Sequence, residues 1–250
     1  LFDQMLLRPL AVREPAQLVN LESPGLKSGS TTCNQSGDCD AVFSYAMFRD
    51  LERAGRERTG LASLAAHRIF GANLAMRGET TSGEAAMVSG SYFPTLGLTA
   101  TLGRLLGPDD DRTIGGHFVA VLSHSYWQAR LGGDPNVLNS TIVVNGHPMT
   151  VVGVAPRGFD GTTLGSRPQV FVPLTMRMQM HPGFTGYENR RNYWIYVFGR
   201  LAPETTVETA ARKLNAVYRP IINDVEAPLQ EGLSAQRLAQ FRARELTVEE

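Results

Sequence analysis

The sequence predicts an α+β fold in which strand and helix units from both ends of the chain flank a β-rich middle. Towards the N-terminus, an apolar strand at 17–22 precedes an amphipathic helix at 44–54. Towards the C-terminus, an apolar strand at 193–198 precedes a second amphipathic helix. In the middle, two β-branched runs flank Asn145-Gly146. Because helices with one apolar face need a sheet to cover, we expect the two ends to share one sheet.

The N-terminal elements follow from short-range periodicity. In the helix at 44–54, every third residue from Tyr45 to Leu51 is apolar, which places these side chains on one helical face. The mixed stretch 61–77 is expected to hold a strand, and 85–89 is expected to form another.

The next elements are a strand and a capped helix. Residues 118–122 are continuously apolar and predict a buried strand. Ser123 is suited to cap the start of a helix at 125–131, because its side-chain oxygen can accept a hydrogen bond from the first turn. The two glycines at 132 and 133 are expected to end that helix.

A hairpin at 141–154 is the clearest local signal in the chain. Asn145 and Gly146 both tolerate the positive φ of a type I′ turn, and β-branched residues precede and follow them. A further strand is predicted at 170–174. We expect this part to have its own small core, made of Val119, Leu122, Trp127, Ile142, Val144 and Val151.

The C-terminal third repeats the order of strand and helix. Thr205 and Glu208 fit a capping box, which predicts that a helix begins there. The apolar residues of this helix share one face, and Pro220 is expected to end it. A shorter helix is predicted at 234–244, close to the end of the chain.

Composition excludes two classes of protein. The chain has 250 residues with 24 basic and 24 acidic side chains, so its formal net charge is zero. A general nucleic-acid binder would need an excess of Lys and Arg to neutralise phosphates. The longest apolar run is 193–198, far shorter than the ~20 residues that span a bilayer. We expect a soluble segment cut from a longer protein, because the chain starts at Leu1 without Met.

The two cysteines, Cys33 and Cys39, lie in a stretch rich in Ser, Gly and Thr that predicts a surface loop. A zinc site is disfavoured, since four ligands are needed and no histidine lies nearby. Two unrelated thiols are one interpretation. A short disulfide loop is the favoured one, and it would indicate an oxidising compartment.

No catalytic motif is present, so we expect a protein that is not an enzyme, without catalytic residues, cofactor or metal. The hydrolase elbow, the zincin helix and the phosphate-binding Walker loop are all missing from the sequence. Ser123 and His124 are better explained as a helix cap and a half-exposed turn than as a nucleophile and its base. The acidic run 109–111 lacks the ligand spacing of an EF-hand, which favours a solvated turn.

Three methionines, Met176, Met178 and Met180, alternate just before His181. In a strand they would share one face, and thioethers with an imidazole suit Cu(I) in an oxidising compartment. Methionine also fills apolar gaps adaptably. We therefore favour packing, or contact with a partner or the other subdomain, over a metal site.

A series of short motifs follows the chain in a fixed order. The motifs include Leu7-Arg-Pro-Leu10, Val88-Ser-Gly-Ser-Tyr-Phe-Pro-Thr-Leu-Gly97, Leu131-Gly-Gly-Asp-Pro135, Val144-Asn-Gly146 and Val151-Val-Gly-Val-Ala-Pro156. In this order, rather than singly, they resemble a family of bacterial transport proteins, and the resemblance covers almost the whole chain. The chain is similar to the MacB-like periplasmic core domain of ABC-transporter permeases, in particular the large duplicated permease class of acidobacteria and their relatives.

The resemblance implies a porter-like α+β subdomain from both chain ends, with a smaller β-rich subdomain inserted into it. We place the first at residues 1–98 and 175–250, and the second at 99–174. A domain inserted between two transmembrane helices must return both ends to one membrane surface. Residues near Met5 and near Val248 are therefore expected on one face of the larger subdomain.

The resemblance also implies a mechanical function. The domain would lie on the periplasmic face of the bacterial inner membrane and transmit ATP-driven conformational change, or contact export partners. Its expected partners are the transmembrane helices of the same permease, a cytoplasmic ABC ATPase acting through the membrane part, and a periplasmic adaptor or the second permease half. A stand-alone periplasmic ligand-binding protein is the alternative.

Overall fold

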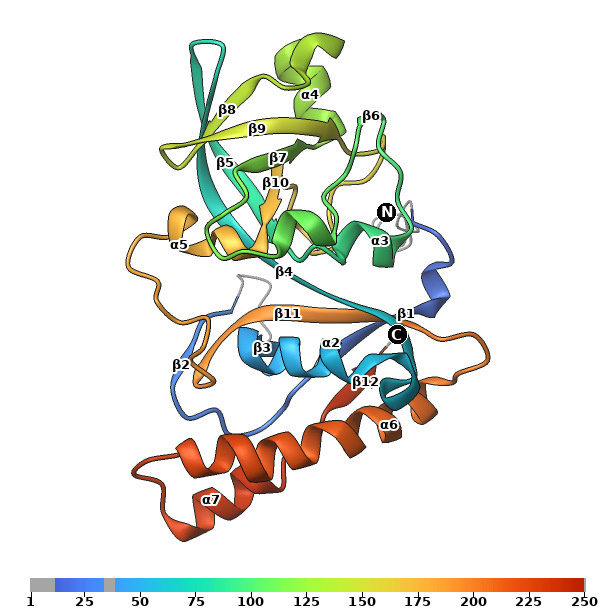
Figure 1. Ribbon diagram of the computed structural model, residues 1–250, viewed down its shortest axis with the longest axis vertical. Helices are drawn as coiled ribbons and strands as arrows, with labels where there is room; N and C mark the ends of the chain where they lie inside the picture. Colours follow the sequence, from blue (N-terminus) through green and yellow to red (C-terminus); the bar gives the residue numbers. More distant parts are fainter. Residues whose placement is uncertain (1–11, 34–38, 250) are drawn as a thin grey trace, which may run out of the picture. The chain divides into compact units, whose positions relative to one another are not determined.

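The computed structural model describes residues 12–33 and 39–249 of the chain (Figure 1). These residues divide into two compact units. The outer unit consists of Ala16–Arg68 and Thr185–Glu250, and the central unit consists mainly of Ile69–Phe184. The chain therefore passes from one unit to the other at positions 15–16, 68–69 and 184–185.

The compact units have other boundaries than the subdomains expected from the sequence, at 98–99 and 174–175: residues 12–15, 69–98 and 175–184 belong to the central unit. Two contacts explain the difference. Strand β5 (Glu79–Val88) pairs in parallel with strand β10 (Val170–Pro173) of the central unit. The ring of Phe93 packs edge-on against that of Phe171, with centroids 5.3 Å apart. Both contacts draw the segment after residue 68 into the central core.

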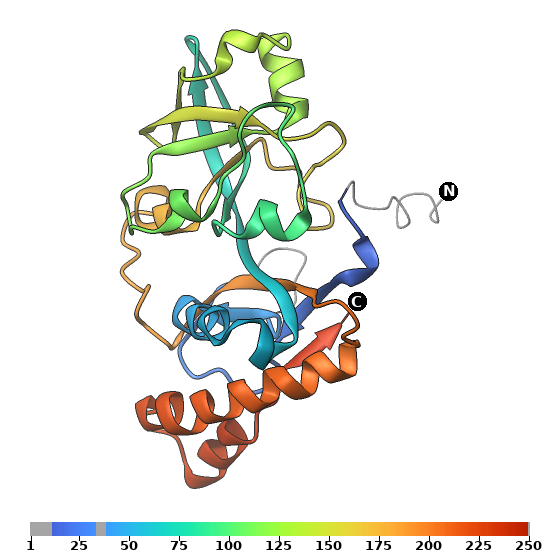
Figure 2. The same ribbon diagram turned by 45° about the vertical axis from the view of Figure 1, so that its right-hand side comes forward.

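The outer unit contains the shared sheet that the sequence predicted. Strand β1 (Leu18–Glu22) pairs antiparallel with β11 (Asn192–Leu201), with Val19 opposite Gly199. β11 also pairs with the first half of β4 (Leu61–Met76), and β1 pairs with β12 (Thr247–Glu249), which lies beside it in Figure 2. The order of strands is β12-β1-β11-β4. Two short strands, β2 (Ser30–Thr31) and β3 (Val42–Ser44), pair with β11 as well.

Two helices of the outer unit, α2 (Tyr45–Thr59) and α6 (Val207–Pro220), lie side by side next to these strands (Figure 1). The predicted apolar faces are the buried ones, with Phe48 and Leu214 both inaccessible to solvent. Burying one such leucine side chain contributes about 1.5–3 kcal/mol. Helix packing on β11 therefore supplies much of the core of this unit.

The start and end of α6 differ from the prediction. Thr206, and not Thr205, caps the helix by accepting a hydrogen bond from the backbone N–H of Thr209. Pro220 does not end the helical path, because its φ of −58° is helical and the chain continues as the π-helix η5 (Ile221–Glu226). The helix α7 (Ala235–Arg242) begins at the predicted place, with Ser234 as its cap.

The central unit is built on strands in the order β4-β5-β10-β7-β9-β6, with β8 pairing both β4 and β9. The predicted hairpin is confirmed: Asn145 and Gly146 have φ values of 48° and 85°, and Val144 stands opposite His147. The strands not yet bounded are β6 (Leu102–Gly103), β7 (Val119–Leu122), β8 (Thr141–Val144) and β9 (His147–Val154).

Helix α4 (His124–Leu131) follows β7 as expected. Ser123 caps it by accepting a hydrogen bond from the N–H of Tyr126 at 3.2 Å, and Gly132 ends it with a φ of 62°. The six residues of the predicted small core lie in this unit, where Val119 is half-buried and the other five are buried. The remaining elements are η1 (Pro15–Gln17), α3 (Tyr92–Leu96), η2 (Pro108–Asp111), η3 (Pro135–Val137), η4 (Leu174–Met176), α5 (Arg177–Met180) and η6 (Ala227–Leu229).

Within residues 12–33 and 39–249, no helix combines the length and apolar character needed to cross a bilayer. The expectation that places Met5 and Val248 on one face involves a residue outside the described ranges. Val248 itself lies in β12, opposite Leu21 of β1.

Candidate functional site

The two cysteines form a disulfide, with their Cα atoms 5.2 Å apart. The segment that leads into it is attached to the beginning of β11. The N–H of Thr32 donates to the carbonyl of Tyr193 at 2.9 Å, and the guanidinium of Arg68 donates to the carbonyl of Thr32 at 2.6 Å. The disulfide therefore closes a loop whose N-terminal arm extends the sheet of the outer unit.

The three methionines lie in a helical segment, so they do not share the single face that a strand would have given them. Residues 174–180 are helical, and successive residues of a helix are rotated by about 100° rather than alternating. Met176 and Met180 are buried in the central unit, whereas Met178 is 42% exposed. The first two act in packing, and only Met178 is available for contact with a partner.

Two other exposed apolar side chains of the central unit are Ile114, on a loop that contacts the methionine segment, and Phe118, beside the hairpin. The N–H of Gly115 donates to the carbonyl of Thr175 at 2.9 Å, which holds the loop of Ile114 against the methionine segment. The ring of Phe118 lies 6.4 Å from that of His147. These exposed apolar residues make this part of the central unit a candidate contact surface.

The acidic run 109–111 is not the solvated turn that the sequence suggested. Only Asp109 is exposed, and it pairs with Arg112 at 2.6 Å. Asp110 is buried and accepts two hydrogen bonds from the Arg104 guanidinium, at 2.5 and 2.8 Å. Burial alone would raise the pKa of Asp110, but the hydrogen bonds from Arg104 and the N–H of Gly107 hold it below its usual value. The carboxylate is thus satisfied by the protein itself.

Asp111 and the pair of Ser123 and His124 also have structural roles. The carboxylate of Asp111 accepts from the N–H groups of Gly90 at 3.1 Å and Thr175 at 2.8 Å, which joins three segments of the central unit. His124 packs edge-on against Trp127, with ring centroids 5.5 Å apart. The oxygen of Ser123 is engaged in capping α4.

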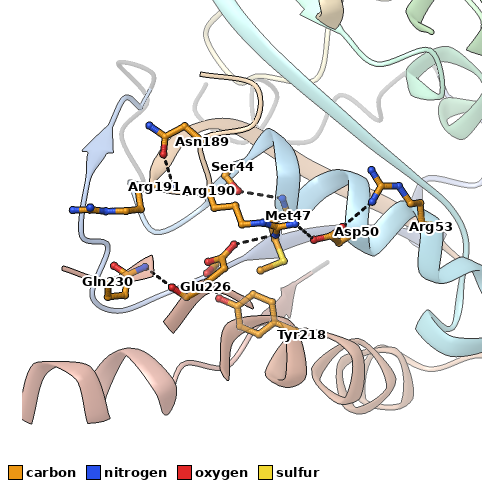
Figure 3. Close-up of polar contacts among 11 residues, drawn as sticks. Ser44, Met47, Asp50, Arg53, Asn189, Arg190, Arg191, Tyr218, Glu226 and Gln230 are labelled. Carbon is orange, nitrogen blue, oxygen red and sulfur yellow. Dashed lines mark hydrogen bonds and ion pairs between the residues drawn. The ribbon is translucent and has the colours of Figure 1, made fainter. Parts of the chain in front are cut away.

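The most unusual polar arrangement is a buried cluster in the outer unit that no sequence motif indicates; Figure 3 shows part of it, with Asp50, Arg190, Tyr218 and Glu226 labelled. Its centre is Glu226, which ends the π-helix η5 and is only 1% exposed. A π-helical turn is rare and often marks a functional position. We define the Glu226 cluster as Ser23, Asp50, Arg190, Tyr193, Tyr218, Glu226 and Arg244.

The charges of the cluster are unevenly paired. Arg190 lies 2.7 Å from the carboxylate of Asp50 but 3.7 Å from that of Glu226 (Figure 3). Asp50 also accepts a hydrogen bond from Arg53 at 2.9 Å. Among the described residues, neither the Oε1 of Glu226 nor the Nη1 of Arg190 has a hydrogen-bond partner. The Oε1 of Glu226 therefore has a long ion-pair contact with Arg190 but no hydrogen bond.

Arg244 contributes a second guanidinium to the cluster. Its Nη2 donates to the carbonyl and the hydroxyl of Ser23, and that hydroxyl lies 2.6 Å from the hydroxyl of Tyr218. Within the described ranges, Nε and Nη1 of Arg244 have no hydrogen-bond partner. Ser23, Tyr193, Tyr218, Glu226 and Arg244 help to line a cavity of about 10 Å³, which is roughly the room that one water molecule needs.

Burial raises the pKa of Glu226 to about 7, and Arg244 and Arg190 only partly oppose the effect. Burial also raises the pKa of Tyr193 to about 12. An acid with a pKa near neutrality can bind or release a proton under ordinary conditions. The arrangement can therefore bind a proton, and the Ser23 hydroxyl of the cluster is engaged with Tyr218 and Arg244.

The comparisons with known proteins agree on one family. The family described as MacB-like periplasmic core domain matches residues 16–217. No curated protein matches the chain in sequence. The crystal structure of the periplasmic region of MacB from Actinobacillus actinomycetemcomitans is similar, with a TM-score of 0.60 and 15% identity over 87% of this chain and 89% of that one.

A second similar crystal structure comes from Gram-positive bacteria. It is the extracellular domain of the noncanonic ABC-type transporter YknZ, with a TM-score of 0.53 and 17% identity. The similarity covers 80% of this chain and 94% of that domain. At these identities the two structures support the fold, and the sequence match over 16–217 supports the family.

Proposed function

We propose, because the chain belongs to the family of MacB-like periplasmic core domains, that it is the extracytoplasmic domain of an ABC-transporter permease. The observation that carries the proposal is the family match, which includes parts of both compact units. The solved relatives are described as a periplasmic region and an extracellular domain of transporters, which supports the same location for this chain.

The domain works mechanically in this proposal and catalyses no reaction. It transmits conformational change, driven by a cytoplasmic ABC ATPase through the transmembrane helices of the same permease, to the extracytoplasmic side. The architecture supports such a role, because the chain passes between its two units at 15–16, 68–69 and 184–185, and the second passage lies within a 16-residue strand, β4. Leu64 of β4 pairs with Gly199 in the outer unit, and Leu74 pairs with Val144 in the central unit.

A partner is expected to bind the exposed apolar residues of the central unit. Ile114, Phe118 and Met178 are 44%, 39% and 42% exposed. Exposed apolar side chains of this size are typical of contact surfaces when they are close together. A periplasmic adaptor or the second permease half is the proposed partner.

The function can be tested in the full-length permease, reconstituted in lipid with its ATPase. Deuterium uptake of this domain is measured with no nucleotide, with a non-hydrolysable ATP analogue, and during hydrolysis. Transmission predicts that peptides of this domain change their exchange rate with nucleotide state. An ATPase variant that binds but does not hydrolyse ATP is the matched control.

Two results would contradict the proposal. The first is that deuterium uptake of this domain is identical in every nucleotide state although uptake of the transmembrane helices changes. The other is activity of a fused reporter enzyme. If a reporter that works only in the cytoplasm is active when it is fused after residue 249, this end of the domain lies in the cytoplasm.

A further inference from the structure

We propose that the carboxyl group of Glu226 is a proton-binding site that controls how firmly the C-terminal helical segment is held on the outer unit. This segment is defined as residues 221–244, and it contains η5, η6 and α7. The protonated carboxyl favours the seated segment, and the ionised carboxylate favours its release.

The first support is the position of Glu226. It lies on the segment itself, is 1% exposed, and faces groups of the unit on which the segment is seated. Releasing the segment would return the carboxyl to water. The seated and released states therefore differ in the solvation of one ionisable group, which is the condition for linkage between seating and pH.

The second support is the pairing of the surrounding charges. The titratable and charged groups that face Glu226 come from every element around it, and they are Asp50 of α2, Arg190 before β11, Tyr193 of β11, Tyr218 of α6 and Arg244 after α7. Lys27 reaches the same region through the carbonyl of Ser23, at 2.6 Å.

Neither guanidinium fully compensates the carboxylate. Arg190 is closer to Asp50 than to Glu226, by 2.7 Å against 3.7 Å. Arg244 uses Nη2 on Ser23. For Glu226, whose Oε1 accepts no hydrogen bond, the cost of desolvation exceeds the gain from the two neighbouring guanidiniums. Burial accordingly raises the pKa of Glu226 from 4.5 to about 7.

The sign of the effect follows from this direction. Because the pKa is higher in the seated state, protonation stabilises seating, and this stabilisation is fully present below pH 4.5 and is lost as the pH rises through about 7. Between pH 5.5 and pH 8 we expect the opening constant of the segment to increase on the order of tenfold.

Hydrogen exchange of the whole chain tests the inference. Exchange rates of peptides from 221–244 are measured for the wild type and for Glu226→Gln at each pH, and their ratio removes the intrinsic dependence of exchange on pH. We expect the ratio of wild type to variant to be near one at about pH 4, to be on the order of ten at pH 5.5, and to rise by roughly a further tenfold or more by pH 8. Glu231→Gln, which removes an exposed glutamate nearby, is the control and should give a flat ratio.

A second variant keeps the test decisive if Glu226→Gln folds poorly. Asp50→Asn frees Arg190 to approach Glu226 and removes a neighbouring negative charge, so the pH midpoint of opening should move lower. The inference is overturned by a flat ratio for Glu226→Gln, by an equal rise in peptides of the central unit, or by an unchanged midpoint in Asp50→Asn.

Discussion

At the scale of residues, two adjacent threonines show how a local motif can be displaced by one position. Thr205 and Glu208 have the spacing of a capping box, yet Thr206 provides the cap of α6. Both residues can accept a hydrogen bond from the first turn, and the backbone decides between them: Thr206 has the extended conformation of a cap, with φ −83° and ψ 160°. Spacing alone does not contain that information.

We expect Thr206→Ala to reduce the free energy of unfolding by about 1 kcal/mol, because the N–H of Thr209 loses its partner. Thr205→Ala is the matched control and should change it much less. Urea denaturation followed by circular dichroism measures both. A larger loss for Thr205→Ala would mean that the capping box is the true start of α6.

Burial of charge is also decided at this scale and was not visible in the sequence. Asp110 and Asp111 stand in a run of acidic residues that looks solvated, but both are buried, and Asp111 is bound by groups far away in the sequence. The N–H of Thr175 that binds Asp111 is 64 residues away. The partners of Glu226 are similarly scattered, with Arg190 36 positions before it. A cluster assembled from such separated segments has no sequence pattern by which it could be found.

At the scale of elements, the backbone at Arg104 approaches β9 so closely that position 153 has no room for a side chain. A Cβ atom added at Gly153 would lie 1.9 Å from the carbonyl oxygen of Arg104, which is backbone and cannot rotate away. At Gly71 of β4, the same atom would meet nothing within 4 Å. A side chain is therefore excluded by sterics at Gly153, whereas there is room for one at Gly71.

Gly153→Ala should lower the free energy of unfolding by 2 kcal/mol or more, roughly the cost of overpacking a core. Gly71→Ala should be neutral or stabilise by up to about 0.5 kcal/mol, because it restricts the unfolded chain. Thermal unfolding monitored by calorimetry gives both values. Equal effects for the two variants would show that β6 does not approach β9 as closely as the structure indicates.

Elements that depend on residues close in the sequence were predicted well, whereas elements that depend on tertiary packing were not. The hairpin turn at Asn145-Gly146 and the periodic face of α2 depend on neighbouring residues, and both are present. The alternation of the three methionines is typical of a strand with one methionine face, but the segment is helical. The alternating pattern would fit a strand only if the extended conformation continued beyond Pro173. In the structure a helical turn follows instead, and it buries the side chains of Met176 and Met180.

At the scale of the whole molecule, the nesting of two parts was predicted but the boundaries were not. The parallel pairing of β5 with β10 joins Ala85 to Val170, and it assigns residues before 99 to the central unit. Parallel strand pairs over such a separation cannot be recognised from one sequence, because the residues of one strand do not identify the strand with which it pairs. The boundary at 68–69 instead falls within a single strand, β4.

Two matched core substitutions test this division. Leu122 of β7 and Leu214 of α6 are both fully buried, one in each unit. Each change to alanine should cost about 2–5 kcal/mol by leaving a cavity. If each unit has its own core, the cost appears as faster local opening in that unit.

We therefore expect Leu122→Ala to accelerate hydrogen exchange within 69–184 and to leave 16–33, 39–68 and 185–249 nearly unchanged. Leu214→Ala should accelerate exchange within 16–33, 39–68 and 185–249 and leave 69–184 nearly unchanged. Within β4, the boundary between accelerated and unchanged exchange should fall between Arg68 and Ile69 for both variants. If either substitution accelerates exchange equally on both sides of residue 68, the two units unfold as one cooperative body. The domain would then carry a mechanical signal as a single block, and β4 would have no separate role in passing it on.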